Sequence, residues 1–314
     1  MQEETKYQIV LAASQYIKEK NLSQNEVARL SGINSGYLSN MLNQKFIVSV
    51  KGKDVEIADR WFYQLSDWAQ LPFKKQVWEV IPTRQFSEIL AQLEYAKKTS
   101  SVITLVADTG LGKTYIIDRF QHRHPRQCVK VTINSTYKLK DILAAICDKI
   151  GVEAAWSTSQ TLTALIEKFK ELKRNGEKMI IIIDEAENMQ LPVLKMLKGL
   201  YDGIKGYTSI ALIATDQLIH TLDRMRRKDA TGIPQLFRRL KAGIRHINNH
   251  NEGFKPFFEK YIPNDKALQK LLLTLCSNYG ELHDYLEPVL REAFETDQPV
   301  TEHMFRLYHN LPNY

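Results

Sequence analysis

Residues 107–114 read ADTGLGKT and carry groups suited to holding nucleotide phosphates. In the pattern G-x-x-x-x-G-K-[ST], the glycines let backbone N–H groups face the phosphates, and Ala107 replaces the first glycine here. Lys113 would neutralise the β- and γ-phosphates, and the Thr114 hydroxyl would bind Mg²⁺. The loop also opens a helix, whose first N–H groups favour anions. We therefore predict an ATP and Mg²⁺ site, as opposed to an accidental turn, formed by Thr109, Gly110, Leu111, Gly112, Lys113, Thr114 and Tyr115.

A second candidate motif is the run MIIIIDEAE at residues 179–187. A buried strand that ends in two adjacent acids is costly unless a cation or water uses them. Asp184 would hold Mg²⁺, mostly through water, and Glu185 would polarise the attacking water as a general base. The alternative is a solvated strand end.

These two motifs together resemble those of AAA+ ATPases, and the resemblance suggests three further sites. The next strand of such a protein supplies a polar sensor near the γ-phosphate, for which Thr215 is the first choice and Asp216 the second; a helix cap is the alternative. The segment IPQLFRRLKAGIR at 233–245 would supply an arginine finger in trans, Arg239 before Arg238. A DNA-facing or solvated basic surface is the alternative. His283 stands where the lid of such proteins has a sensor arginine, and a neutral imidazole gives no fixed charge there.

The elements around these motifs predict an α/β AAA+ P-loop domain with a parallel sheet covered on both faces. It is preceded by an all-α helix-turn-helix domain and followed by a small helical lid. The expected domains are residues 1–69, a linker at 70–82, the ATPase domain at 83–248 and the lid at 249–314. A helix is expected over 54–69, and another that Thr83 caps and that ends near Lys98. The expected strands are Val102–Ala107, Cys128–Ile133, Met179–Ile183, Ser209–Ala214 and Gly243–Ile247.

Residues 23–43, SQNEVARLSGINSGYLSNMLN, have the spacing of a helix-turn-helix. Gly32 suits the turn because it lacks a Cβ. The second helix would expose polar side chains to phosphates or base edges, namely those of Asn34, Ser35, Tyr37, Ser39 and Asn40. Residues 1–70 hold eight basic and eight acidic residues, however, which weakens the DNA interpretation. A helical hairpin that binds no DNA is the alternative.

The net charge of the 314-residue chain is +7, and its distribution is uneven. Residues 223–245 hold eight basic residues against two acids, a net of +6. No apolar run approaches the ~18 residues that span a membrane, and the start MQEETKYQ lacks a signal-peptide core. Cys128, Cys147 and Cys276 lie far apart, which indicates reduced, buried thiols. We expect a cytoplasmic protein with no membrane partner.

The order and spacing of all these motifs resemble the phage Mu B transposition protein family, and more distantly TnsC-type and IstB-type helpers. The resemblance covers nearly the whole chain. It implies an ATP-dependent, largely non-sequence-specific binder of double-stranded DNA that assembles with itself into filaments and delivers target DNA to a transposase. It also implies DNA contacts in the loop after the second strand, at Thr136, Tyr137, Lys138 and Lys140. An ordinary helix start with solvated lysines is the alternative there.

Two other functions fit the same motifs. An ATP-responsive helix-turn-helix transcription regulator would read an operator with its N-terminal domain. A helicase-loader-type ATPase would use that domain to contact protein. Nothing after residue 250 resembles a ligand-sensor repeat array, which counts against many ATP-switched regulators.

Overall fold

The computed structural model describes residues 1, 3–50, 53–73, 77–79, 81–248 and 254–312. The chain divides into two compact units, one of Met1–Val80 with Tyr285–Tyr314 and one of Ile81–Asp284. Each unit contains a buried apolar cluster of its own.

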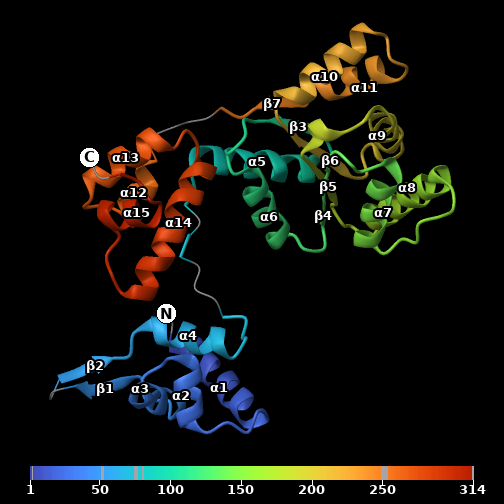
Figure 1. Cartoon of the computed structure of the whole chain (residues 1–314). Coiled ribbons are helices and arrows are strands. Elements are labelled where there is room, and N and C mark those ends of the chain that lie inside the picture. The colour runs from blue at the N-terminus through green and yellow to red at the C-terminus, as the bar shows by residue number, and fades with distance from the viewer. Residues whose placement is uncertain (2, 51–52, 74–76, 80, 249–253, 313–314) are drawn as a thin grey trace. The chain divides into compact units, whose positions relative to one another are not determined.

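The larger unit is built on a five-stranded parallel sheet in the order β4-β5-β6-β3-β7 (Figure 1). Three of its strands, β3, β5 and β6, are apolar runs that are buried almost throughout, and β4 is buried except at Lys130 and Thr132, which is the pattern of a covered parallel sheet. The parallel sheet expected from the sequence is thereby confirmed. The strands are β3 (Val102–Val106), β4 (Cys128–Thr132), β5 (Ile180–Asp184), β6 (Ser209–Ala214) and β7 (Ile244–His246).

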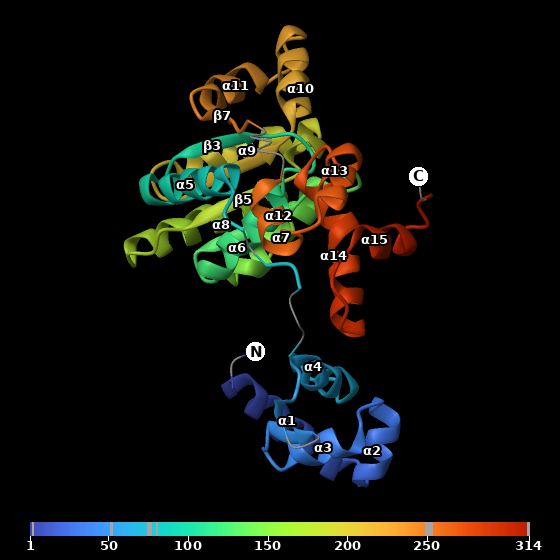
Figure 2. The same cartoon turned by 90° about the vertical axis from the view of Figure 1, so that its left-hand side faces the viewer.

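Helices cover both faces of this sheet (Figures 1 and 2). Helices α5 and α6 pack together on one side, while α7, α8, α9 and α11 follow one another on the other. The Thr83 hydroxyl accepts a hydrogen bond from the Phe86 N–H at 3.2 Å, which confirms the predicted cap. The helices are α5 (Arg84–Thr99), α6 (Lys113–Arg123), α7 (Leu139–Ile150), α8 (Thr158–Arg174), α9 (Leu191–Ile204), α10 (Asp216–Arg227) and α11 (Ile233–Lys241).

The N-terminal region is mostly helical, as expected. Its helices are α1 (Glu3–Glu19), α2 (Gln24–Ser31), α3 (Ser35–Leu42) and α4 (Asp59–Trp68). Ser23 and Glu26 form a capping box at the start of α2. Gly32 ends that helix with φ 69°, a left-handed conformation that is unfavourable for residues with a Cβ.

The all-α expectation for this region was wrong at residues 47–56. Strands β1 (Ile47–Val50) and β2 (Lys53–Glu56) pair antiparallel, with Val48 opposite Val55. The helix expected from residue 54 therefore begins only at Asp59. The reason is local: IVSV is rich in β-branched residues, and the apolar Val55 and Ile57 alternate with polar neighbours, which suits a strand better than a helix.

After residue 254 the described chain is helical, as expected from its apolar spacing, with α12 (Lys255–Tyr261), α13 (Lys266–Leu275), α14 (Tyr279–Thr296) and α15 (Glu302–Tyr308). Among the described residues, none of the helices combines the length and hydropathy needed to cross a bilayer. The three cysteines are buried and unpaired. Burial raises the pKa of the Cys128 and Cys276 thiols to about 12, so they stay protonated.

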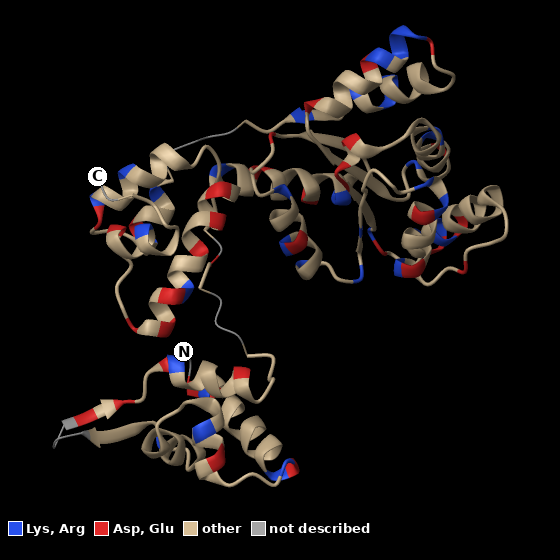
Figure 3. Ribbon diagram, in the orientation of Figure 1, with Lys and Arg blue, Asp and Glu red and all other residues tan. Residues whose placement is uncertain are grey.

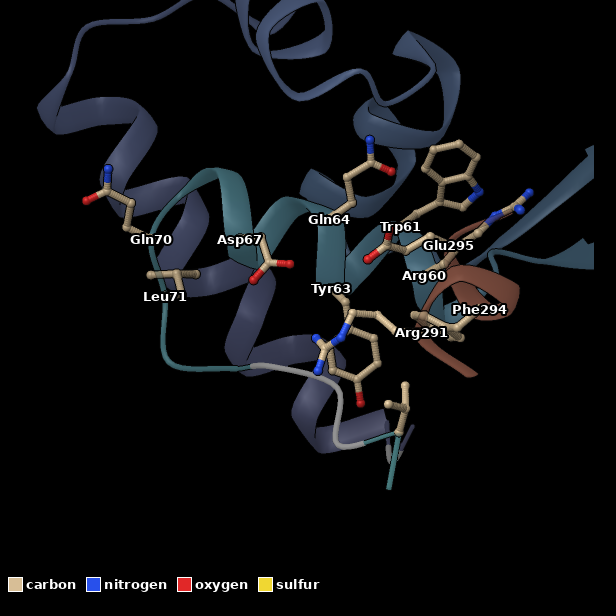
Figure 4. Close-up of a pocket in the computed structure, with 11 residues that line it drawn as sticks. Arg60, Trp61, Tyr63, Gln64, Asp67, Gln70, Leu71, Arg291, Phe294 and Glu295 are labelled. Atoms are coloured by element: carbon tan, nitrogen blue, oxygen red, sulfur yellow. The ribbon is translucent and has the colours of Figure 1, made fainter. Parts of the chain in front are cut away.

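A hollow of about 890 Å³ lies in the smaller unit between α4 and the end of α14 (Figure 4). Tyr63 and Phe294 meet there edge to face with ring centroids 5.8 Å apart, and Arg60 pairs with Asp297 at 3.2 Å. None of the residues predicted to bind nucleotide or DNA lines it.

Candidate nucleotide site

The predicted phosphate loop connects the end of β3 to the start of α6. Gly110 and Gly112 have φ 75° and 74°, so both glycines of the motif adopt the left-handed backbone that the loop requires. The Lys113 Nζ donates to the carbonyl oxygens of Ala107 at 2.6 Å and Asp108 at 2.8 Å. Burial lowers the pKa of Lys113, while nearby carboxylates, Glu187 foremost, oppose this shift. The ammonium group is thus held at the mouth of a cradle of backbone groups.

The two predicted magnesium ligands lie side by side. The Thr114 hydroxyl donates to Asp184 Oδ2 at 3.0 Å, although the residues are 70 positions apart in sequence. Asp184 is buried at the end of β5, and its Oδ1 accepts the N–H of Glu185 at 3.1 Å. Lys130 Nζ lies 3.8 Å from Asp184 Oδ2 and bonds Asp118 at 2.5 Å. A hydroxyl and a carboxylate are oxygen donors that suit Mg²⁺, which usually takes its other ligands from water and phosphate.

Glu185 occupies an unusual backbone conformation for a residue with a side chain. Its φ of 54° and ψ of 42° are left-handed, a strain that clusters at functional sites. The Asn188 side-chain amide donates to Glu185 Oε2 at 3.2 Å and to the Ile133 carbonyl at 3.0 Å. Asn188 therefore fastens the predicted general base to the end of β4. The sequence did not identify Asn188, because only the folded chain brings it to Ile133.

This contact gives a first testable prediction. Asn188→Ala should slow ATP hydrolysis about 3- to 10-fold, since one hydrogen bond contributes about 1 kcal/mol and tenfold in rate is about 1.4 kcal/mol. ATP affinity should not change, because Asn188 contacts the base and not the phosphate loop. Steady-state hydrolysis and nucleotide binding would measure both. Gln190→Ala is the matched control, since Gln190 bonds Ser135 instead of Glu185. An unchanged rate in Asn188→Ala would refute the positioning role.

Thr215, the first choice for the sensor, directly follows β6, which lies between β5 and β3. It precedes α10, but its side chain makes no capping bond and its buried hydroxyl has no hydrogen-bond partner. Asp216, the second choice, is exposed and lies 3.7 Å from the His246 ring. A buried hydroxyl without a partner is costly, so Thr215 is the better candidate for a ligand contact.

The two arginines proposed as a finger differ in their surroundings. Arg239 is half-buried, pairs with Asp202 at 2.9 Å and stacks over Tyr201. It lines a hollow with Val102, at the end of β3 opposite the phosphate loop. Arg238 is exposed. Within its own subunit, Arg239 is thus tied to α9, whereas Arg238 is available to a neighbour.

The start of α14 and the residue before it contact the phosphate loop directly. The Gly280 N–H donates to the Gly110 carbonyl at 2.9 Å, and a Cβ on Gly110 would lie 2.1 Å from Asn278 Oδ1. Asn278 was not predicted, because glycine spacing alone does not show this close approach. His283 is exposed, with its ring 3.1 Å from Asp284.

The residues predicted to touch DNA are only partly free to do so. Thr136 and Lys138 are exposed in the loop before α7, and Lys140 is exposed in the first turn of that helix, while Tyr137 packs against the core. In the N-terminal region, Asn34 caps α3 by accepting the Gly36 N–H at 2.9 Å. Ser35 is exposed, and Ser39 is half-buried. Tyr37 is half-buried with its ring 5.9 Å from that of Trp61, and the Asn40 side chain donates to the Gly36 carbonyl.

Comparisons with known proteins identify the kind of domain in which this site lies. Residues 96–222 match the family described as AAA domain. Among solved structures, Cdc6p from Pyrobaculum aerophilum has a TM-score of 0.52 at 14% identity, covering 71% of this chain and 65% of that one. The ORC1 protein of Aeropyrum pernix, solved in complex with DNA, has a TM-score of 0.54 at 16% identity, covering 78% and 69%. Residues 96–222 thus match an AAA domain, and the fold of the larger unit agrees with the expected AAA+ fold.

A relative of known role indicates which kind of AAA protein this chain resembles. The chain is 26% identical over 187 residues to the Mu-like prophage FluMu DNA transposition protein B of Haemophilus influenzae. That match covers 59% of this chain and 62% of the relative, so it spans about three fifths of the relative's length. The chain is thus similar to a Mu-like transposition protein B and carries a match to the AAA domain, in agreement with the resemblance that its motifs indicated.

Proposed function

We propose that this protein hydrolyses ATP to control its assembly on double-stranded DNA, and that the assembly delivers this DNA to a transposase. The observation that carries the proposal is the meeting of Thr114 and Asp184 at 3.0 Å beside the phosphate-loop lysine, in a chain similar to a transposition protein. Domain bounds of 1–69, 70–82, 83–248 and 249–314 remain part of this proposal.

The chemistry assigned to the site follows from its geometry. Lys113 would leave the Ala107 and Asp108 carbonyls for the β- and γ-phosphates. Mg²⁺ would lie against the Thr114 hydroxyl and, through water, the Asp184 carboxylate, where it would neutralise developing charge. Glu185, held by Asn188, would accept the proton of the attacking water. The Thr215 hydroxyl, which has no partner in the described structure, would lie near the γ-phosphate and form a hydrogen bond with the attacking water.

Assembly would supply a positive charge that the nucleotide site of a single subunit lacks. In the described parts of the chain no arginine side chain bonds residues 107–114 or the acids at the end of β5, and Arg119 is held by the Tyr115 hydroxyl at 3.2 Å. A neighbouring subunit would therefore provide the guanidinium. Stacked subunits would present the exposed Thr136, Lys138 and Lys140 to DNA, while α3 would contact DNA or a protein partner.

DNA binding distinguishes this function from a transcription regulator. With an ATP analogue, binding to duplexes of random sequence should be nearly uniform and should fall steeply with salt, because phosphate contacts carry no sequence information. Lys138→Ala with Lys140→Ala should weaken all duplexes alike. Fluorescence anisotropy over a salt series would measure this. Strong preference for one operator, abolished by Ser35→Glu on α3, would favour the regulator instead.

A further inference from the structure

The excess positive charge of the chain is concentrated in residues 223–245, which form the end of α10, the turn after it, α11 and the start of β7, and which we call the basic segment (Figure 3). It carries a net charge of +6 in a chain whose net charge is +7, so the rest of the chain has a net charge of only +1. In the view of Figure 3 the blue residues gather along α10 toward the turn.

The charges of this segment are mostly uncompensated. Asp223 pairs with Arg226 at 3.0 Å, and Asp202 with Arg239 at 2.9 Å. Five other side chains are exposed and form no ion pair or hydrogen bond in the described structure: Arg224, Arg227, Lys228, Arg238 and Lys241.

Three of these side chains share one face of a helix. Arg224, Arg227 and Lys228 stand at positions i, i+3 and i+4 of α10 and its C-cap, which makes them neighbours on the helix surface. Like charges at this spacing repel one another, so the arrangement is unfavourable in the free protein. A polyanion that bridges them would relieve this repulsion.

The face of α10 that carries Arg224, Arg227 and Lys228 lacks the features of a protein-binding surface. Such interfaces have an apolar or aromatic centre surrounded by a polar rim. All the exposed large apolar side chains of the described chain lie outside residues 216–246, and the apolar residues of α11 are buried. A charged surface without an apolar centre fits the phosphate backbone of DNA better than another protein.

We infer that Arg224, Arg227 and Lys228 form a phosphate-binding surface for duplex DNA, separate from the loop before α7. This inference rests on the proposed DNA-binding function and supplies the charge that the function needs. The N-terminal region has no net charge over residues 1–70. The loop before α7 and the first turn of that helix offer only Lys138 and Lys140, with Asp141 beside them. The basic segment, by contrast, has enough unpaired cationic side chains to neutralise several phosphates.

The test is the salt dependence of DNA binding by the full chain with an ATP analogue. The triple variant Arg224→Gln, Arg227→Gln, Lys228→Gln should bind random duplexes more weakly and without change in sequence preference. The slope of log K against log salt should fall in magnitude by about 2 to 3, because each phosphate that the variant no longer neutralises lowers it by about 0.9. The matched control is Lys168→Gln, Lys170→Gln, Lys173→Gln on α8, which removes the same charge from residues with partners of their own. The control should keep the wild-type slope.

The outcomes separate this surface from the function on which it rests. If the triple variant kept the wild-type salt slope, the proposed phosphate-binding surface would be wrong, but the proposed DNA-binding function would not be contradicted. Normal DNA binding with loss of ATP-dependent self-association would assign the segment to a protein contact, which also overturns it. If the wild-type chain bound no duplex with any nucleotide, both proposals would fall. Circular dichroism and retained ATP binding would show that the triple variant is folded.

Discussion

Glu185→Gln should bind ATP normally but hydrolyse it about 10²- to 10⁴-fold more slowly, the contribution typical of a general base. Glutamine keeps the size of the side chain and an oxygen that Asn188 can bond, but it cannot accept the proton of water. The ATP-bound complexes with DNA should persist, because slow hydrolysis would no longer cause their disassembly. Single-turnover hydrolysis and the lifetime of the DNA complex would measure the two effects.

The matched control is Glu177→Gln, which removes a carboxylate just before β5, at the sheet edge opposite the site. It should hydrolyse ATP at the wild-type rate. Normal turnover in Glu185→Gln would exclude Glu185 as the base.

A second variant, Lys113→Ala, should lose ATP binding itself, because the phosphates lose their fixed cation.

The sequence predicted the strands and the phosphate loop well because both depend on local pattern. Apolar runs such as Ser209–Ala214 mark covered parallel strands, and the glycines of the loop are demanded by its backbone. Once strand order is known, the carboxyl ends of parallel strands meet at one edge. Asp184 and Thr114 therefore had to come together.

The contacts between distant side chains could not be predicted in the same way. Asn188 reaches Ile133, Asn278 packs on Gly110, and Arg239 pairs with Asp202 only because packed elements bring them together. Neither motif spacing nor periodicity encodes these distances. The β1–β2 hairpin is a different case, since its β-branched residues were present in the sequence but the helical interpretation of residues 54–69 prevailed.

The Arg239 contact changes which arginine is expected to act on a neighbouring subunit. A finger must leave its own subunit, and Arg239 would first have to give up Asp202 and its place over Tyr201. Arg238 is exposed and faces no such cost. We therefore expect Arg238→Ala to keep ATP binding and to lose about 10³- to 10⁵-fold in DNA-stimulated hydrolysis, the usual contribution of such a finger. Arg239→Ala should mainly lower thermal stability.

Mixing two inactive variants tests whether the arginine acts in trans. Lys113→Ala protein cannot bind ATP but retains Arg238, and Arg238→Ala protein has an intact phosphate loop. At a mixed interface the first can donate its arginine to the second, so DNA-stimulated hydrolysis should return on mixing. No recovery would mean that the arginine does not act in trans. If Arg239→Ala alone showed the large loss, the finger would be Arg239, which would then have to break its Asp202 pair on assembly.

Electron microscopy of the wild-type protein on random-sequence duplex DNA tests the central claim most directly. ATP or a slowly hydrolysed analogue should give continuous filaments along the DNA. The same DNA with ADP, or with the Lys113→Ala protein and ATP, should remain bare. Such a difference would show that ATP at the phosphate loop drives assembly on DNA without sequence preference. Filaments that form equally well without nucleotide, or single particles at one operator in the presence of ATP, would contradict it.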